Sequence, residues 1–339
     1  MLDSSPQPIG TGLRRASILG TGSYLPERVL PNAELENMVD TSDHWILTRT
    51  GMRERRIARP DEATSDMASA AALHALENAE IDPSELELIV VATSTPDMLF
   101  PNTAAFVQRQ IEAENAACMD VEAACSGFLY GMEVGRQFVQ TRSMDRVMVI
   151  GAEKMSSVTD WEDRHTCILF GDGAGAAVLG PSSGGGIIHT KMGSAGALAD
   201  LLKIPGGGSR YPASHETVES RMHFIKMQGQ EVFRNAVEKM SHTAGAVLDQ
   251  SGLTIGDIKY IVPHQANARI IKAVGQRLGA SDAQMYTNVD KYGNTSAASV
   301  IVAIDEASRA GLLEKGDRIM IVVFGAGFTW GATVLEWDR

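Results

Sequence analysis

Three side chains in this chain of 339 residues could together provide a nucleophile and two hydrogen-bond donors: the thiol of Cys125, the imidazole of His264 and the carboxamide of Asn294. The stretch 121–138 predicts a short extended segment followed by a helix, with Cys125 in or near the first turn. Unpaired backbone N–H groups and the positive end of the helix dipole favour a thiolate there, and such positions lower a cysteine pKa from about 8.5 toward neutrality. We therefore expect a nucleophile at Cys125, with a buried structural thiol as the alternative.

His264 and Asn294 follow a similar pattern further along the chain. His264 comes directly after the apolar strand predicted at 258–262, and Asn294 precedes a helix rich in small residues. Taken singly, each has an ordinary explanation, a hydrogen-bonded histidine at a strand end and a helix N-cap. Gly325 follows another apolar strand, where a glycine can simply form a turn. The carboxyl ends of strands in α/β sheets converge on one crevice, so we expect these four residues to lie together. Cys125 would be the nucleophile, and His264 and Asn294 would donate hydrogen bonds. The backbone N–H groups of Cys125 and Gly325 would form an oxyanion hole.

The elements that must position these residues recur in the same order in two parts of the chain. The strand predicted at 86–92 corresponds to 258–262, and that at 147–150 to 319–323. We expect an α/β protein of two similar halves, packed as alternating helix and mixed-sheet layers. Further helices are predicted at 32–39, 64–79, 102–111, 229–248, 268–278 and 296–310, further strands at 118–121 and near 187, and extended chain at 167–180.

The domain boundaries follow from the turn signal at 181–186, which is rich in Pro, Ser and Gly. We expect residues 16–183 to form the half with the nucleophile. Residues 184–339 are then the half with the histidine, the asparagine and the oxyanion loop. Residues 1–15 are predicted to be a flexible tail.

Composition excludes several other classes of protein. The formal net charge of −12 argues against nucleic-acid binding. Three cysteines without CxxC spacing indicate neither a disulfide framework nor a zinc site and favour a reducing cytoplasm. No run of about 20 apolar residues is present, so we expect no membrane span, and the polar N-terminus lacks a secretory signal.

Seven motifs give the chain a specific resemblance to β-ketoacyl-acyl-carrier-protein synthase III, the condensing enzyme that initiates bacterial fatty-acid synthesis in the thiolase fold. The resemblance runs in order from about Ala16 to the C-terminus. The motifs are GTGSYLP (20–26), TSDHWILTRTG (41–51), AACSG (123–127), FGDGAGAAV (170–178), VPHQAN (262–267), GNTSAAS (293–299) and GFTWG (327–331).

This resemblance implies a reaction for the predicted site. Cys125 would take an acyl group from an acyl-CoA primer, with acetyl-CoA as the expected primer, and hold it as a thioester. His264 and Asn294 would donate hydrogen bonds to the thioester carbonyl of malonyl-acyl-carrier protein and stabilise the enolate that remains when carbon dioxide departs. The carbanion would then attack acyl-Cys125, whose oxyanion would rest on the N–H groups of Cys125 and Gly325. The reaction implies no metal or redox cofactor.

The resemblance also implies residues for coenzyme A and for a second copy of the chain. Trp45 and Arg164 match positions that sandwich the adenine of coenzyme A, which suits a planar base, and Arg49 matches a position near its phosphates. Phe100 matches a position that reaches across a dimer interface to close the partner's acyl pocket, so a homodimer is implied.

Docking of the acidic carrier protein on an acidic enzyme requires a local basic patch. Arg234, Arg269 and Arg277 match the family's docking cations. Lys272 lies about one helical turn after Arg269, and we add it to the predicted patch. The alternative for each is a solvated surface charge.

Two features depart from the family pattern. The glycine triplet before Phe-Thr-Trp is here Gly325-Ala326-Gly327, although Gly325 still supplies its N–H. The glycine-rich segment 204–212 has no assigned role. The sequence also leaves the length and branching of the primer open.

Four other classes of protein compete with this interpretation. A starter synthase of polyketide or alkylquinolone synthesis shares the Cys-His-Asn set. A thiolase would use a second cysteine near the C-terminal glycine loop, but none follows Cys167. A cysteine hydrolase using Cys125 and His264 would release free acid without malonyl substrate. A scaffold without activity would be expected to lack part of the set, and all three residues are present.

Overall fold

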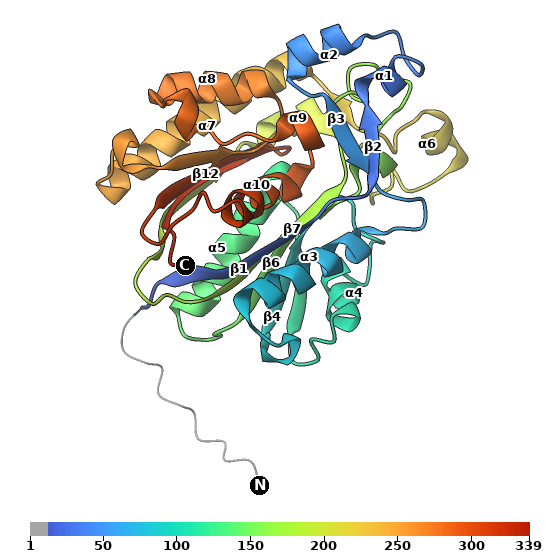
Figure 1. Cartoon of the computed structure of the whole chain (residues 1–339). Helices are drawn as coiled ribbons and strands as arrows, with labels where there is room; N and C mark the ends of the chain where they lie inside the picture. The colour runs from blue at the N-terminus through green and yellow to red at the C-terminus, as the bar shows by residue number, and fades with distance from the viewer. Residues whose placement is uncertain (1–12) are drawn as a thin grey trace.

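Two mixed β-sheets organise the computed structural model, which describes residues 13–339 (Figure 1). The first has the strand order β1-β7-β6-β4-β5, and the second β11-β12-β13-β8. The strands of the first are β1 (Ala16–Tyr24), β4 (Leu88–Ala92), β5 (Ala117–Val121), β6 (Val147–Glu153) and β7 (Gly173–Pro181). Those of the second are β8 (Gly186–Ser194), β11 (Tyr260–Pro263), β12 (Arg318–Gly325) and β13 (Thr329–Glu336).

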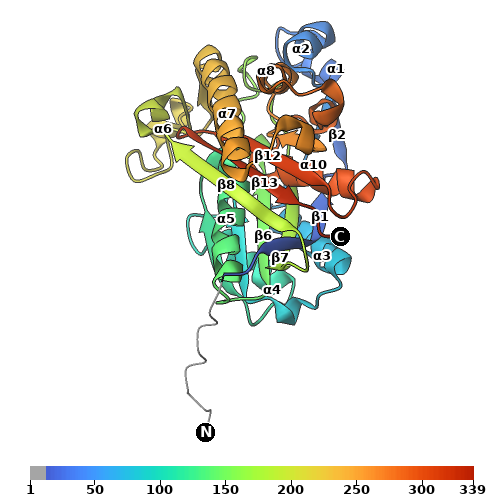
Figure 2. The ribbon, with the colours of Figure 1, turned by 90° about the vertical axis from the view of Figure 1, so that its left-hand side faces the viewer.

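Helices form three layers around and between the sheets, so the described chain has five layers (Figures 1 and 2). The outer face of the first sheet is covered by α3 (Thr64–Ala79) and α4 (Thr103–Gln110), and that of the second by α7 (Gly229–Ser251) and α8 (Ala268–Leu278). Between the sheets lie α5 (Gly127–Gln140) and α10 (Ser299–Arg309). Their apolar faces share one core cluster with strands of both sheets. The sheets and central helices therefore form a continuous interior that fixes the loops at their ends.

Small side chains allow these layers to approach closely. Every residue of β4 and β6 is buried because helices cover both faces of the sheet. Alanines dominate the buried face of α3, which packs against β1. Gly22 of β1 has no room for a Cβ, which would collide with the backbone of α3 at Ala75. The motif 20–26 thus serves helix–sheet packing.

The two sheets correspond strand by strand, which confirms the predicted fold class. In each, one parallel pair (β4 with β6, β11 with β12) continues into two antiparallel strands (β7 and β1, β13 and β8). A single parallel bridge between Ile261 and Met285 stands where the first sheet has β5. The turn after Pro181 connects the two sheets. The domain boundaries at residues 16 and 184 stay a prediction.

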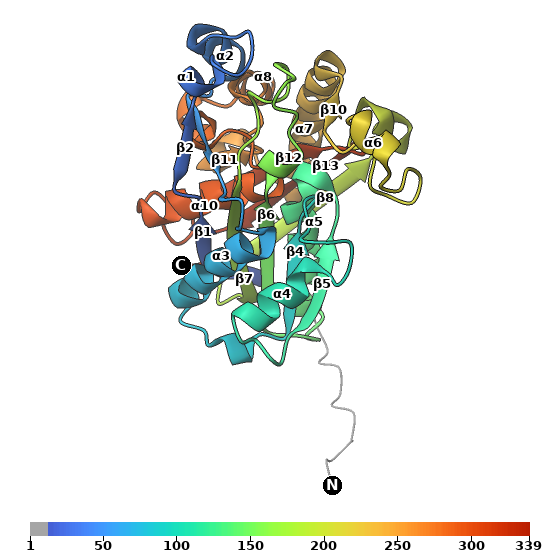
Figure 3. The same cartoon turned by 90° about the vertical axis from the view of Figure 1, so that its right-hand side faces the viewer.

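Smaller elements complete the described chain and surround the end of the molecule where the two sheets' parallel strands terminate (Figure 3). They are β2 (Arg28–Pro31), β3 (Glu54–Ile57), β9 (Leu202–Lys203), β10 (Lys226–Met227), α1 (Asn32–Leu35), α2 (Asp43–Thr50), α6 (His215–Glu219) and α9 (Val289–Tyr292). Seven 3-10 turns are described in residues 13–339, and two matter for the site: η2 (Ala124–Ser126) and η7 (Ser296–Ala298).

The predicted elements match well where periodicity is strong. Helices 64–79 and 268–278 have the predicted ends, and 229–248 continues to Ser251. Residues 167–172 turn rather than extend, so only the part from Gly173 is a strand. The predicted helix 296–310 begins as η7, and β13 was not predicted.

Two further expectations concern the ends of the chain and the membrane. Of the predicted tail 1–15, only 13–15 lie among the described residues. Arg14 donates to the carbonyls of Val139 and Met144 and pairs with Asp145. Within residues 13–339, no helix has the length and apolar content to cross a bilayer.

Candidate active site

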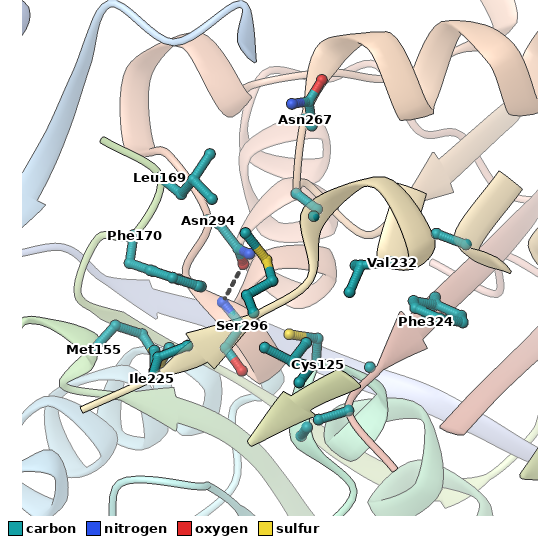
Figure 4. A pocket seen from close by; sticks show the side chains of 18 of the residues that line it. Cys125, Met155, Leu169, Phe170, Ile225, Val232, Asn267, Asn294, Ser296 and Phe324 are labelled. Atoms are coloured by element: carbon teal, nitrogen blue, oxygen red, sulfur yellow. Dashed lines mark hydrogen bonds between the residues drawn. The ribbon is translucent and has the colours of Figure 1, made fainter. Parts of the chain in front are cut away.

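A cavity of about 1020 Å³ opens at the carboxyl ends of β11 and β12 and the start of the central helices. Cys125, His264, Asn294 and Gly325 all line it, although they come from four separate segments. Figure 4 shows Cys125 and Asn294 on its wall. The convergence that sequence order suggested is therefore realised in space. Met155, Phe170, Ile225, Val232 and Phe324 surround the thiol with apolar surface (Figure 4).

Cys125 lies in η2, two residues before α5, rather than inside the helix. The preceding residue, Ala124, has a φ of 45°, a left-handed conformation that non-glycine residues rarely adopt. Only 9% of Cys125 is exposed, and burial raises its pKa to about 12, although a hydrogen bond with Ser296 lowers it. This differs from the sequence-based expectation of a lowered pKa, because removing the thiolate from water outweighs the favourable end of α5. Cys125 is therefore a thiol that needs a proton acceptor to react.

His264 is buried directly after β11 and is held by α10. Its Nδ1 lies 2.7 Å from the Oγ of Ser299, which also accepts the N–H of Gln265 at 3.4 Å. The hydroxyl proton of Ser299 is thus available to Nδ1, which leaves the hydrogen on Nε2. Burial lowers the pKa of His264 to about 3, so the ring is neutral at physiological pH. Such an imidazole is a hydrogen-bond donor and a weak base.

Asn294 is oriented by the start of the next turn. Its Oδ1 accepts the backbone N–H of Ser296 at 2.9 Å, and its own N–H donates to the carbonyl of Leu169 at 2.8 Å. Because Oδ1 is engaged, the side-chain NH₂ group is the part of Asn294 left to donate to a ligand. His264 and Asn294 therefore offer two uncharged donors to the same cavity.

Gly325 brings the end of β12 against the backbone of Cys125. A Cβ at this position would lie 2.8 Å from the Cys125 nitrogen, so only glycine fits without displacement. Thr329 donates from Oγ1 to the carbonyl of Ala123 at 2.9 Å and fixes β13 to the same turn. The methyl group of Ala326 lies on the cavity wall one residue further on.

The residues predicted for coenzyme A lie near the cavity on a basic and aromatic cluster. Two guanidinium groups lie near the ring of Trp45 on α2, that of Arg49 at 4.7 Å and that of Arg164 at 4.6 Å from the ring centroid. Trp45 and Arg49 line the cavity, whereas Arg164 does not and pairs with Asp40 at 3.2 Å. A base stacked between Trp45 and Arg164 would have to displace that guanidinium from the indole face.

The predicted docking cations lie on α7 and α8, which pack against each other. Arg269 lines the cavity and lies 5.5 Å from the ring of Phe233. Arg234 on α7 is exposed and pairs with Glu231. Lys272 and Arg277 are exposed further along α8 and do not line the cavity.

Phe100 lies outside this cavity, in the loop between β4 and α4. It is 84% exposed and follows two further exposed apolar residues, Met98 and Leu99. No metal-binding group of three or more His, Cys, Asp or Glu occurs among residues 13–339.

The structure adds three polar residues that sequence reasoning passed over: Glu153, Ser296 and Ser299. Glu153 is the last residue of β6 and is buried in the interior. An acidic residue at the end of an apolar run is the sequence feature that could have identified it. Ser296 and Ser299 lie inside the quoted motif 293–299, but nothing in their spacing shows which partners they reach. Ser296 bonds to Glu153 across the boundary between the two halves, whereas Ser299 bonds to His264 and Gln265 within the second half.

A buried cysteine beside two neutral donors, at the junction of two similar α/β halves, defines a thiolase-fold enzyme that transfers acyl groups. Family models described as 3-Oxoacyl-[acyl-carrier-protein (ACP)] synthase III and its C-terminal part match residues 119–196 and 248–337. The chain is 55% identical over 325 residues to the β-ketoacyl-[acyl-carrier-protein] synthase III of Caldanaerobacter subterraneus, which covers 96% of this chain and 98% of the relative. It belongs to the β-ketoacyl-[acyl-carrier-protein] synthase III family and is a condensing enzyme.

Solved structures agree with this assignment. The 3-oxoacyl-[acyl-carrier-protein] synthase III of Aquifex aeolicus is 43% identical with a TM-score of 0.89, over 95% of this chain and all of that one. The priming β-ketosynthase of the R1128 polyketide pathway has a TM-score of 0.90 at 36% identity, over 98% and 99% of the two chains. The fold alone therefore does not separate the two kinds of synthase, whereas sequence identity is greater to the first.

Proposed function

We propose that this chain condenses an acyl-CoA primer, acetyl-CoA in the first instance, with malonyl-acyl-carrier protein. The products are a 3-ketoacyl-acyl-carrier protein, carbon dioxide and free CoA, and the reaction begins fatty-acid synthesis. The observation that carries the proposal is the convergence of Cys125, His264 and Asn294 on one cavity, with both donors uncharged. Membership of the synthase III family supports it.

The first half-reaction loads the nucleophile. The sulfur of Cys125 attacks the primer's thioester carbonyl and gives its proton to an acceptor in the protein. The oxyanion accepts hydrogen bonds from the N–H groups of Cys125 and Gly325, and CoA leaves as its thiolate. The contact between Gly325 and the Cys125 backbone supports this oxyanion hole. The apolar surround of the thiol suits a short acyl chain.

The second half-reaction forms the carbon–carbon bond. His264 Nε2–H and the Asn294 amide donate to the malonyl thioester oxygen, which becomes the enolate oxygen as the carboxylate leaves as carbon dioxide. The carbanion attacks acyl-Cys125, and collapse of the tetrahedral adduct releases the Cys125 thiolate. Each step needs only hydrogen-bond donors and a proton acceptor, which protein side chains can supply, so we propose that the enzyme uses no cofactor.

Substrate binding is assigned to the clusters around the cavity. Trp45 and Arg164 hold the adenine of coenzyme A after Arg164 moves aside, and Arg49 pairs with its phosphates. The basic residues of α7 and α8 dock the acidic carrier protein: Arg234, Arg269, Lys272 and Arg277. Arg269 is the one that also lines the cavity, so we place the phosphopantetheine entry beside it.

We further propose a cytoplasmic homodimer. Three consecutive exposed apolar residues, Met98, Leu99 and Phe100, form a patch that water disfavours and a second copy of the chain would bury. Phe100 would then close the acyl pocket of the partner.

Intact-protein mass after incubation with acetyl-CoA tests the proposal, with Cys125→Ser as the control. We expect an acetyl adduct on wild type alone, discharged by malonyl-carrier protein with release of carbon dioxide and a 3-ketoacyl product. Discharge as free acid without malonyl substrate would instead indicate a hydrolase, and loading only by longer or aromatic acyl-CoA a specialised synthase. No adduct with any acyl-CoA would refute the role of Cys125.

A further inference from the structure

Glu153 is a buried carboxylate that the condensation mechanism does not use. It ends β6 with no exposed surface and accepts four hydrogen-bond donors. Thr95 donates from Oγ1 at 2.6 Å and Thr93 from Oγ1 at 3.3 Å, while the backbone N–H of Ser94 reaches both carboxylate oxygens at 3.1 Å. The fourth donor is Ser296 Oγ, at 2.9 Å from Oε1. Four donors stabilise the ionised form in a site that otherwise disfavours charge.

Ser296 links this carboxylate to the nucleophile. Its hydroxyl donates to Glu153 at 2.9 Å, and Ser296 and Cys125 line the same cavity, where the Ser296 hydroxyl also interacts with the sulfur of Cys125. Figure 4 shows Ser296 between Asn294 and Cys125 on the cavity wall. Its φ of 48° is a conformation that costs energy in a non-glycine residue, and its N–H fixes Asn294. The turn is therefore held in a shape that presents one hydroxyl to both groups.

Other titratable groups near Glu153 are directed elsewhere. Lys154, the next residue, donates from Nζ to backbone carbonyls of residues 59, 60 and 62. Asp172, beside β7, accepts from Ser156 and from the N–H of Ala58. Glu122 accepts from Ser94 and Ala124, and its charge raises the Cys125 pKa. Cys125 is thus the acid that the Ser296–Glu153 pair faces.

We infer that Ser296 and Glu153 carry the proton of the Cys125 thiol during catalysis. As the sulfur attacks the primer, the S–H proton passes to Ser296 Oγ and the Ser296 proton passes to Glu153 Oε1. CoA leaves as its thiolate and takes a proton from solvent. When the condensation releases the Cys125 thiolate, Glu153 returns its proton through Ser296. The sum consumes one solvent proton per turnover, as a decarboxylative condensation requires.

Acid–base chemistry favours Glu153 over His264 for this task. Burial raises the pKa of Glu153 to about 7, close to the working pH at which a general base is most effective. The lowered pKa of His264 makes its ring a poor base. Cys125 itself, with its pKa raised by burial, gains most from a base inside the same dry cavity.

This inference rests on the proposed function for its substrate but can be tested without it. The pH dependence of Cys125 alkylation by iodoacetamide, followed by peptide mass spectrometry, needs no acyl-CoA. Single-turnover acetylation of Cys125 from acetyl-CoA, measured from pH 5.5 to 9, then tests the same groups in the proposed reaction. If wild type is alkylated with the expected profile but takes no acyl group, only the proposed function fails.

Three variants separate proton transfer from structural support. In wild type, both rates rise with pH and level off above an apparent pKa near 7. Ser296→Ala and Glu153→Gln each interrupt the route, so we expect rates 10- to 100-fold lower at pH 7 that keep rising to pH 9. Thr93→Val removes one hydrogen bond to Glu153 but leaves the route intact, and its profile should match wild type.

The shape of the profile decides the outcome. If Ser296→Ala and Glu153→Gln retain the wild-type midpoint near pH 7, the inference is wrong, whatever their absolute rates. A plain structural role for Glu153 would lower folding stability in Glu153→Gln and in Thr93→Val alike and leave the midpoint unchanged. Should Glu153→Gln fail to fold, Ser296→Ala alone still decides between the two results.

Discussion

The two turns that lead into the central helices, η2 and η7, have similar backbone conformations but carry different side chains. Their first residues, Ala124 and Ser296, have φ of 45° and 48°. In each turn the third residue donates to the carbonyl before the turn, at 3.0 Å in η2 and 3.1 Å in η7. In each, a side chain two residues upstream accepts the N–H of the strained residue, Glu122 in the first half and Asn294 in the second.

Side chains make the difference between the turns. The middle residue of η2 is Cys125, which faces the cavity, whereas its counterpart in η7 is Ala297, fully buried against Gly151 of β6. The strained residue carries only a methyl group in η2 and a hydroxyl in η7. In the proposed reaction, one turn would supply the nucleophile and the other the hydrogen-bonding groups around it. Duplicated backbone geometry fixes both turns at one junction, and the division of chemistry between them makes the site.

Exchanging the middle residues should have the largest effect. Cys125→Ala is expected to reduce condensation by at least about 10³-fold, because the nucleophile is lost. Adding Ala297→Cys to that variant should restore nothing, since position 297 faces the sheet. Condensation assays and intact mass after acetyl-CoA report both results. Acylation of a cysteine at 297 would show that the turn, rather than its surroundings, makes the nucleophile.

Removing the donors of the second half should separate the two half-reactions. His264→Ala and Asn294→Ala are each expected to lower condensation by about 10²- to 10³-fold, because the enolate loses a hydrogen bond. Loading of Cys125 should stay within about 10-fold of wild type. Carbon dioxide release and adduct formation are measured on the same samples. An equal loss of loading in both variants would contradict the assignment of these donors to the second step.

The pH dependence of stability should reveal one buried titratable group from each half. Burial lowers the pKa of His264 to about 3, so on acidification His264 is protonated in the unfolded protein before it is protonated in the folded one. The free energy of unfolding therefore falls as pH drops from about 6.5 toward 3. Glu153 has a raised pKa of about 7, so stability instead rises as pH drops from about 7 to 4.5. Each slope is at most about 1.4 kcal/mol per pH unit, and the two oppose each other in the window they share.

Single variants expose the two slopes. Relative to wild type, His264→Gln should gain stability as pH falls from 6.5 to 5, and Glu153→Gln should lose it. Urea unfolding of all three proteins at several pH values measures the differences, in which other titrating groups cancel. Parallel curves for the three proteins would mean that neither group is shifted by burial.

Relaxing the strained residues should have the smallest effect. Ala124→Gly removes left-handed strain but adds unfolded-state entropy, so the free energy of unfolding should change by less than about 1 kcal/mol. Ser296→Gly changes the backbone in the same way but also removes one of the four donors to Glu153, so it should lower the free energy of unfolding by about 1–2 kcal/mol more. Urea unfolding at pH 8 compares the two, and equal costs would show that the Ser296–Glu153 bond adds no stability.

Sequence periodicity and the order of the motifs were sufficient to predict many of the helices and strands of this protein. Alanine spacing predicts α3 to the residue, and unbroken apolar runs locate β4, β6 and β12, because burial on both faces leaves a plain signature. The positions of Cys125, His264 and Asn294 at the ends of such elements predicted their convergence. Less regular segments were harder to predict. In β13, apolar and polar residues alternate only weakly after a glycine loop. Residues 167–172 form turns because they contact residues far away in the sequence.

The residue types and their order along the chain thus determined the fold class and the family, and they predicted which three side chains meet in the cavity. Only the tertiary structure decided their electrostatic state. Burial of Cys125 raises its pKa where helix position alone predicted the reverse, and burial keeps His264 neutral. The partnership of Ser296 and Glu153 likewise joins residues 143 positions apart. Desolvation and such long-range hydrogen bonds depend on what packs around a group, and local sequence does not contain that information.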